Sequence, residues 1–313
     1  MIAWRKFSPG RLSMLSNNAC GAGKVTPNGK RLGPRVDCLD RWLRHVAGTR
    51  DKSPRIASWA GGVAVSMAMS LFAIGGARAA ETPCPPSTPR HVDLPATRAA
   101  VSAGRPITIV AFGSSSTAGA GATAPDRTYP ARLEARLKTR LPNTPVTVLN
   151  RGSGGQTVEA MLARLDDDVL AVRPTLVIWQ AGANEALRGT DPTRFEALLD
   201  EGVRRIVAAG SDLVLMDNQV APRLPPTESQ AVFGAVLARE ARVRSVSLFS
   251  RTALMREWQT AATPAIELPK GETSAEDMIG RDGVHHTDRG YACLAASLGD
   301  AIAASTVALT SRR

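Results

Sequence analysis

The sequence predicts an α/β fold in which one parallel five-stranded sheet is covered by helices on both faces. Two observations predict it: short apolar runs of strand length recur along the chain, and stretches with helical periodicity separate them. Strands that alternate with helices are typical of parallel sheets joined by right-handed crossovers. We therefore expect a three-layer α/β/α sandwich.

Five apolar runs predict the strands. Each has the length of a strand, and the first four carry β-favouring residues on both faces, which indicates burial on both faces of the sheet. Trp179 and Met216 fall inside two of these runs and are expected in the core. The predicted strands cover residues 107–112, 146–149, 176–179, 213–216 and 246–249.

The stretches between and after these runs predict helices, because their apolar residues recur every three or four positions. The three consecutive acids at 166–168 lie in the second helical stretch. Consecutive side chains on a helix diverge by ~100°, so they predict a solvated face and no metal site. The predicted helices cover residues 129–141, 158–172, 195–209, 229–242 and 288–308.

Positive charge is concentrated at the N-terminus. The formal net charge is +11, but residues 1–55 hold 12 of the 39 Lys and Arg residues and three of the 28 acids. The remaining chain is nearly neutral and has no basic stripe interleaved with aromatics, which argues against a nucleic-acid partner. We interpret residues 1–55 as a basic extension outside the fold.

Residues 56–79 resemble a targeting segment. Residues 56–74 carry no charge, follow several basic residues and precede the small residues Ala77 and Ala79. This pattern is typical of a Sec signal peptide cleaved before Ala80, and it predicts a periplasmic or secreted protein. The basic region is long for a signal peptide, and 19 apolar residues can span a bilayer. The alternatives are therefore an inner-membrane anchor, with the domain facing the periplasm, or a buried helix.

The chain after this segment divides into a lead-in and a domain. Residues 80–104 are rich in Pro, Thr and Ala and predict an extended lead-in, whereas 105–313 holds the predicted sheet. Export would leave Cys84 and Cys293, which can pair in an oxidising compartment. Their pairing would tie the lead-in to the last helix. The alternative is a free Cys84 and a buried Cys293.

The segments that follow the predicted strands are rich in Gly, Ser and Asn. Ligands of parallel sheets bind beyond the carboxyl ends of the strands, so these segments are candidates for the site. They read Gly-Ser-Ser-Ser-Thr-Ala-Gly at 113–119, Asn-Arg-Gly-Ser-Gly-Gly-Gln-Thr at 150–157 and Gly-Ala-Asn-Glu at 182–185. An Asp-Gly-Val-His segment follows at 282–285.

These residue types suit nucleophilic catalysis. A serine nucleophile needs a general base, and the base needs an acceptor that orients it. Two of the four histidines lie in the extension and the lead-in, which leaves His285 and His286. Asp282 is close enough to orient His285, although it could instead form a loop turn. His286 is expected to point elsewhere, to the surface or behind the site, and the nucleophile is a serine within 114–116.

A tetrahedral intermediate also needs hydrogen-bond donors for its oxyanion. Gly154 or Gly155 can offer a backbone N–H, because glycine-rich loops expose their amides. Asn184 carries a side-chain amide that can serve as a donor or hold the loop.

Together the four segments resemble the conserved blocks of the SGNH/GDSL hydrolase family. Its first block, Gly-Asp-Ser-Leu-Thr-x-Gly, matches 113–119 and makes Ser115 the nucleophile; the second matches 150–157 and assigns the oxyanion glycine to Gly155. Gly-x-Asn-Asp matches 182–185, and Asp-x-x-His matches 282–285. The sequence departs from these blocks at supporting positions, namely Ser114, Ser116, Gly154 and Glu185.

The resemblance implies a flavodoxin-like SGNH fold with a Ser115–His285–Asp282 triad. The oxyanion donors would be the N–H groups of Ser115 and Gly155 and the side chain of Asn184. No metal and no cofactor are implied. The expected function is an exported serine esterase that hydrolyses carboxylic esters of an acylated sugar, a lipid or a small alcohol.

Two alternatives remain open from the sequence. The same site could transfer acyl groups to a cell-envelope glycan, as an O-acyltransferase, and the Gly-rich loops could belong to an envelope binding protein. Three polar residues that follow the third and fourth strands are candidates for contact with a polar substrate, or else surface or loop residues: Arg188, Gln219 and Arg223.

Overall fold

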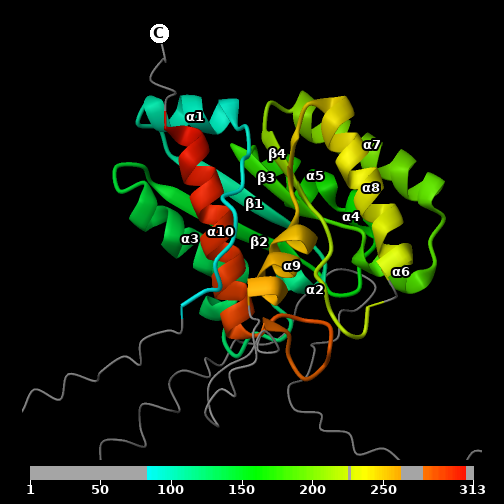
Figure 1. Cartoon of the computed structure of the whole chain (residues 1–313). Coiled ribbons are helices and arrows are strands. Elements are labelled where there is room, and N and C mark those ends of the chain that lie inside the picture. The colour runs from blue at the N-terminus through cyan, green and yellow to red at the C-terminus, as the bar shows by residue number, and fades with distance from the viewer. Residues whose placement is uncertain (1–82, 225–226, 262–277, 308–313) are drawn as a thin grey trace, which may run out of the picture. The chain divides into compact units, whose positions relative to one another are not determined.

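The computed structural model describes residues 83–224, 227–261 and 278–307. They contain a five-stranded sheet in the order β2-β1-β3-β4-β5, and every pair of neighbouring strands is parallel (Figure 1). The predicted α/β sheet is therefore confirmed, strand by strand. The strands are β1 (Ile107–Gly113), β2 (Val146–Gly152), β3 (Leu176–Gln180), β4 (Asp212–Met216) and β5 (Ser247–Phe249).

Helices cover both faces of the sheet and complete the predicted three layers (Figure 1). One face carries α1 (Pro95–Ser102), α3 (Tyr129–Arg140), α9 (Arg251–Ala261) and α10 (Asp288–Thr306). The opposite face carries α4 (Val158–Leu162), α5 (Leu165–Asp168), α6 (Ala183–Arg188), α7 (Pro192–Ala208) and α8 (Thr227–Arg244). The remaining short elements are α2 (Ser115–Ala118) and the 3₁₀ turns η1 (Pro125–Arg127) and η2 (Leu170–Val172).

The two hydrophobic cores share the central strands. In β3, Leu176 and Ile178 pack toward α10, whereas Val177 and Trp179 pack toward α7. Because successive side chains of a strand point to opposite faces, a strand covered on both sides needs apolar residues at every position. This is why the central strands appear as unbroken apolar runs. Trp179 and Met216 are fully buried, as predicted.

Strand β2 departs from the prediction of burial on both faces. Val146 is its one buried residue, and the others are half-buried or exposed. Among the described strands it lies at the edge of the sheet and pairs with β1 alone. A strand in that place is covered less completely than the central strands, although its sequence is similarly apolar.

The helix predicted over 158–172 is wrong as a single element, because it is divided into α4, α5 and η2. The break falls at Arg164, whose backbone leaves the helical region at φ −118° and ψ 10°. Its guanidinium donates to the carbonyl of Gly113 over 3.1 Å and to Gln156 Oε1 over 2.6 Å. These contacts hold the guanidinium at the strand ends, while its Nη1 also pairs with Asp168 four residues on.

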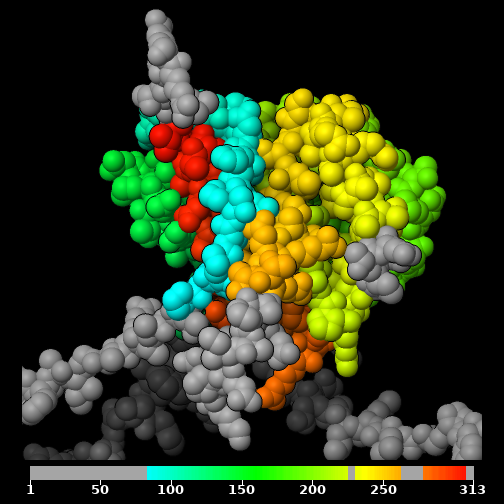
Figure 2. Space-filling view, viewed as in Figure 1, coloured from blue at the N-terminus to red at the C-terminus, as the bar shows by residue number. Residues whose placement is uncertain are grey.

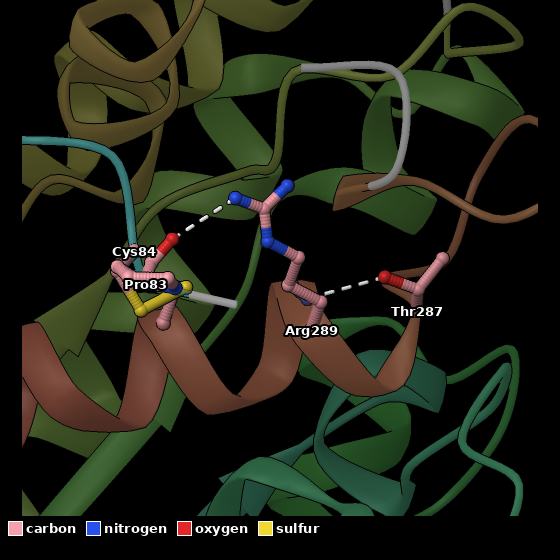
Figure 3. Close-up of a disulfide and its surroundings, with 6 residues drawn as sticks. Pro83, Cys84, Thr287 and Arg289 are labelled. Atoms are coloured by element: carbon pink, nitrogen blue, oxygen red, sulfur yellow. Dashed lines mark hydrogen bonds between the residues drawn. A yellow bond between two sulfur atoms is a disulfide. The ribbon is translucent and has the colours of Figure 1, made fainter. Parts of the chain in front are cut away.

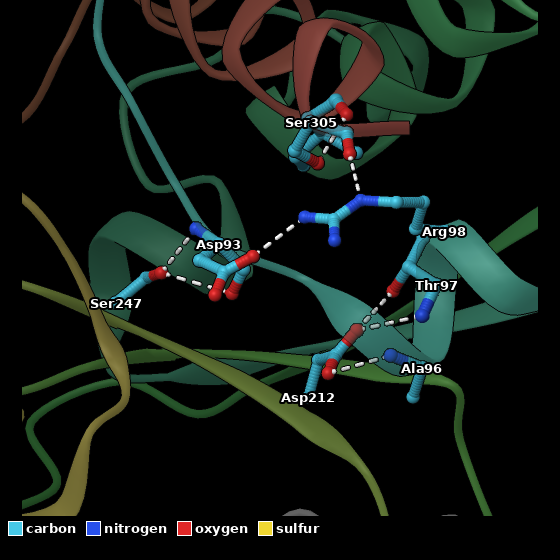
Figure 4. A network of polar contacts seen from close by, with 8 residues as sticks. Asp93, Ala96, Thr97, Arg98, Asp212, Ser247 and Ser305 are labelled. Atoms are coloured by element: carbon cyan, nitrogen blue, oxygen red, sulfur yellow. Dashed lines mark hydrogen bonds and ion pairs between the residues drawn. The ribbon is translucent and has the colours of Figure 1, made fainter. Parts of the chain in front are cut away.

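The extended lead-in predicted through residue 104 is wrong for residues 95–102, which form α1. Pro95 occupies a first-turn position, where its ring suits the helix and its missing N–H costs no hydrogen bond. The Asp212 carboxylate at the start of β4 accepts hydrogen bonds from Ala96 N and from Thr97 N and Oγ1 (Figure 4). A carboxylate from a distant strand thus satisfies the first turn of α1.

Residues 83–94 lead into α1 without regular secondary structure. They run along the surface between α10 and α9 (Figure 2). Cys84 forms a disulfide with Cys293 of α10, and Arg289 donates to the carbonyl of Pro83 over 3.0 Å (Figure 3). The structure therefore contains the cysteine pair, and the alternative of a free Cys84 is wrong.

The basic extension and the targeting segment, residues 1–55 and 56–79, lie outside the described residues. Among the helices that the structure does describe, none is long and apolar enough to cross a membrane.

Candidate active site

Ser115 is the first residue of α2, immediately after β1. The preceding turn is held from β3, because Gln180 Oε1 accepts hydrogen bonds from Ser114 N over 3.1 Å and from Ser114 Oγ over 2.9 Å. Gly152 allows β2 to pass close by, since a Cβ there would lie 2.0 Å from Ala118 N. The turn therefore holds Ser115 at the carboxyl edge of the sheet.

His285 reaches Ser115 from the segment before α10. Its Nε2 lies 2.8 Å from Ser115 Oγ, and its Nδ1 lies 2.6 Å from Asp282 Oδ2. An ionised carboxylate only accepts hydrogen bonds, so Nδ1 carries the proton and Nε2 accepts from the serine hydroxyl. The structure thus brings the three predicted triad residues together across 170 residues of sequence.

Asp282 keeps its negative charge while it orients His285. Partial burial works against ionisation, but N–H groups of His285 and Val284 donate to Oδ1, and the imidazole faces Oδ2. These hydrogen bonds outweigh burial and lower the pKa of Asp282 to about 2. The sequence offered a loop turn and an orienting acceptor as alternatives for Asp282. In the structure this carboxylate makes both sets of contacts.

The second glycine-rich loop is clamped by α6. Asn184 Nδ2 donates to the carbonyl of Gln156 over 2.9 Å, and Arg188 Nη2 donates to the carbonyl of Gly155 over 2.6 Å. Asn184 and Arg188 are one helical turn apart, so both reach the loop from the same side. The structure thus gives Asn184 the loop-holding contact, and among the described residues the second hydrogen of its amide has no acceptor.

The loop itself presents backbone amides. Gly155 has φ +72°, a conformation that favours glycine, and it is half-buried. Within the described part of the chain, no acceptor is present for the N–H groups of Ser115 and Gly155. Donors of this kind, with no partner of their own, are what a developing oxyanion requires.

Two supporting residues were missed by the sequence reasoning. Arg164 joins the carbonyl of Gly113 to the side chain of Gln156 and stacks on Phe112 at 4.4 Å, so it connects the serine turn with the glycine-rich loop. Gln180 holds the serine turn. Two features of the sequence could have pointed to these residues. Arg164 lies inside an amphipathic stretch, and Gln180 is a polar residue at the end of an apolar strand.

His286 points away from the site, but the alternative of a surface position is wrong. Its ring is fully buried, its Nδ1 lies 3.1 Å from the carbonyl of Met278, and its ring centroid lies 5.3 Å from that of Tyr291. Burial, with a smaller effect from the nearby Arg251 charge, lowers the pKa of His286 to about 3. The residue is therefore neutral near pH 7.

The other polar candidates have structural contacts. Glu185 is buried and accepts from Val158 N over 2.5 Å and from Gly182 N over 3.1 Å, which joins α4 to α6. Burial raises its pKa despite these hydrogen bonds. Asp166 forms an ion pair with Arg205, and Asp168 forms one with Arg164.

Of the three residues proposed for a polar substrate, Arg188 is exposed on α6 beside the glycine-rich loop. Arg223 is exposed too, and its backbone N–H donates to the carbonyl of Gly283 over 2.9 Å. Gln219 lies in the loop after β4, as one alternative had it, but it is buried, with 2% of its surface exposed.

Known proteins share parts of this sequence. The chain is 32% identical to Esterase TesA of Pseudomonas aeruginosa over 96 residues, which are 30% of this chain and 48% of TesA. It is 35% identical to an arylesterase of Vibrio mimicus over 77 residues, 25% of this chain and 38% of that protein. The chain therefore matches about half, or less, of the length of these two relatives.

A solved structure shares the fold. The acetylxylan esterase Axe2 of Geobacillus stearothermophilus superposes with a TM-score of 0.51 over 63% of this chain and 94% of that one, at 21% sequence identity. Residues 81–307, which include all the segments described above, match the sequence profile of the Non-GDSL lipase-like family. That range is most of the chain, and the chain therefore belongs to this family of SGNH/GDSL hydrolases.

Proposed function

We propose that the protein is a serine esterase that hydrolyses carboxylic esters through an acyl-enzyme. The observation that carries the proposal is the continuous hydrogen-bonded chain from Ser115 Oγ to His285 Nε2, at 2.8 Å, and from His285 Nδ1 to Asp282, at 2.6 Å. Both distances are those of a nucleophile and a base in working contact. The esterase names of the two relatives agree with it.

In the first step, Ser115 Oγ attacks the ester carbonyl carbon while its proton passes to His285 Nε2. The N–H groups of Ser115 and Gly155 and the Asn184 amide donate to the oxyanion. Collapse of the tetrahedral intermediate breaks the bond to the alcohol, which leaves with the proton from His285. Asp282, ionised throughout, stabilises the imidazolium formed between these steps.

In the second step, water attacks the acyl-Ser115 carbonyl and gives its proton to His285. The carboxylic acid leaves, and the proton returns to Ser115 Oγ. The cycle restores the enzyme and consumes one ester and one water.

Hydrolysis of p-nitrophenyl acetate and butyrate tests the proposal. The Ser115→Ala and His285→Ala variants should each lose at least ~10³-fold in kcat, because the nucleophile or its base is gone. Ser102→Ala on α1 and His91→Ala in the lead-in are matched controls, since both side chains are exposed and remote from the triad in sequence. Turnover in Ser115→Ala equal to that of the wild type would refute the mechanism.

The acceptor of the acyl group is tested separately. We propose water as that acceptor, and an assay that offers an acylated donor, a cell-envelope glycan and water together should yield free acid. Transfer to the glycan as the main product would instead establish the O-acyltransferase alternative. Failure of a fluorophosphonate to label Ser115 would favour a binding protein.

We also propose that the domain functions after export, in the periplasm or outside the cell. The Cys84–Cys293 disulfide supports this, because disulfides persist in oxidising compartments. The N-terminal sequence of the protein recovered from a periplasmic fraction should begin at or near Ala80. Recovery of the full-length chain from the membrane fraction would identify residues 56–74 as an anchor.

A further inference from the structure

Gln219 lies in the loop after β4, far from the triad in sequence. It nevertheless contacts the residue next to Ser115 and the residue next to His285. Its Nε2 donates to the carbonyl of Val284 over 3.0 Å, and Val284 immediately precedes His285. Its Oε1 lies 3.5 Å from Ser116 Oγ, and Ser116 immediately follows Ser115. One buried side chain therefore links the histidine loop with the serine turn.

Arg251 determines which way this amide faces. Arg251 Nη2 donates to Gln219 Oε1 over 2.6 Å. A guanidinium has donors and no acceptor, so the oxygen of the amide must face Arg251 and its NH₂ group must face the carbonyl of Val284. The opposite orientation would place two donors together and two acceptors together. The charge on Arg251 thus fixes the donor that holds the histidine loop.

Burial of the charged Arg251 side chain costs free energy of folding. It is fully buried, its Nε donates to the backbone carbonyl of Asp217 over 3.1 Å, and its Nη1 has no partner among the described residues. The Asp217 carboxylate is engaged elsewhere, by Ser250 Oγ and Thr252 N. A buried guanidinium without a direct carboxylate partner is unfavourable, and an apolar side chain would suit stability better.

We propose that Gln219 and Arg251 are positioning residues, which set His285 against Ser115 by holding the carbonyl of Val284. The inference rests on the proposed esterase function of the triad. Asp282 orients the imidazole within its own loop, and Gln219 relates that loop to the rest of the site. A displacement of about 1 Å between nucleophile and base can slow the chemical step by up to ~10²-fold.

The Gln219→Glu variant tests this proposal sharply. The carboxylate keeps the size of the amide and still pairs with Arg251, but it cannot donate to the carbonyl of Val284 and repels it instead. We expect kcat to fall by ~10- to 100-fold and KM to stay within about twofold, because substrate contacts are unchanged. Gln259→Glu, exposed on α9, is the control for the added charge.

The rate must be separated from the folded fraction. Exhaustive labelling with a fluorophosphonate counts the competent Ser115 side chains, and kcat is then expressed per labelled site. A role in folding alone would lower the labelled fraction and leave this kcat at the wild-type value, which would overturn the proposal. A second variant, Gln219→Met, removes the donor without adding charge and should show the same loss, so either folded variant decides.

Failure of the underlying function would look different. If the wild-type chain showed no turnover that depends on Ser115, the esterase proposal would fall. If the wild type is active and a folded Gln219 variant matches its kcat per labelled site, the esterase proposal stands and the positioning role is refuted.

Discussion

The two ends of strand β4 differ in whether their buried polar groups have hydrogen-bond partners. At its start, Asp212 accepts three hydrogen bonds from the first turn of α1, and both carboxylate oxygens have partners (Figure 4). Beyond its end, Asn218 is buried with neither side-chain oxygen nor nitrogen partnered among the described residues, and Arg251 has an unpartnered Nη1. The start of the strand is fully satisfied, whereas the end is not.

This difference separates stability from function. Each unsatisfied buried polar group costs free energy, so a cluster of them persists only where something other than stability is gained. Gln180 Nε2, at the end of the neighbouring strand β3, is also without a partner among the described residues. We therefore expect substitutions at the amino end of the sheet to change unfolding, and substitutions at the carboxyl end to change turnover. The predictions that follow probe this division, from the largest effect to the smallest.

Replacing Asn184 with Ala at the carboxyl end should have the largest effect. It removes one oxyanion donor and the hydrogen bond to the carbonyl of Gln156. We expect kcat on p-nitrophenyl butyrate to fall by ~10²–10³-fold, as for other oxyanion donors, with a small change in urea unfolding. Asn143→Ala, in an exposed turn, is the control. A fall of less than about threefold in kcat would show that Asn184 only holds the loop.

Replacing Asp212 with Ala at the amino end should change stability and leave the chemistry intact. Three hydrogen bonds to a helix start are lost in a buried place, so the free energy of unfolding should fall by ~2–3 kcal/mol. Urea unfolding measures this, and kcat per labelled Ser115 should be unchanged. Asp93→Ala, which breaks an exposed ion pair with Arg98, should cost well under ~1 kcal/mol. A large loss of kcat in Asp212→Ala would contradict the division.

Replacing His286 with Phe should flatten the acid side of the stability profile. Burial lowers the pKa of His286 to about 3 in the folded state from its ordinary value of 6.5, so the unfolded chain takes up the proton first as the pH falls. Wild-type stability therefore declines between about pH 6.5 and pH 3, by ~2 kcal/mol at pH 5. The variant lacks this decline, and the carbonyl of Met278 keeps its hydrogen bond from Thr287 N.

Urea unfolding at pH 7 and pH 5 measures the difference. His91→Phe, exposed in the lead-in, is the matched control and should follow the wild type. Equal acid destabilisation of the wild type and His286→Phe would show that the buried ring does not resist protonation.

Replacing Arg188 with Ala should have the smallest effect. The side chain is exposed, and hydrogen bonds at exposed positions are weak, so loosening the loop at Gly155 should lower kcat by only about two- to fivefold. Arg194→Ala, which breaks an exposed ion pair with Glu159, controls for the lost charge. A loss as large as that of Asn184→Ala would place Arg188 among the groups that contact the substrate.

Elements with strong local signals were predictable from the sequence. The first four strands carry β-favouring residues on both faces, and α3, α7, α8 and α10 have long stretches of helical period. Helix α9 was missed although it has a local signal, because its buried residues Leu254, Met255 and Trp258 recur at helical spacing. The other missed helices depend on contacts made in the folded chain. Helix α1 begins under the Asp212 carboxylate, and α2 and α6 are too short to show a period. The break at Arg164 also depends on distant partners, Gly113 and Gln156.

The candidate site divides in the same way. The positions of four short segments, after strands or before the last helix, marked the site, and their resemblance to the SGNH/GDSL blocks assigned Ser115, Gly155, Asn184, Asp282 and His285. The sequence by itself thus determined the fold class and the residue types that the proposed chemistry requires. Local composition carries that information.

Only the tertiary structure decided how those residues are held. The hydrogen bonds from Gln219 to Val284 and from Arg251 to Gln219 join residues 65 and 32 positions apart. Neither has a local signature, because a buried glutamine and a buried arginine look like surface residues in a sequence. Their roles arise from the packing of β4, α9 and the histidine loop against one another, where a donor can find only one acceptor.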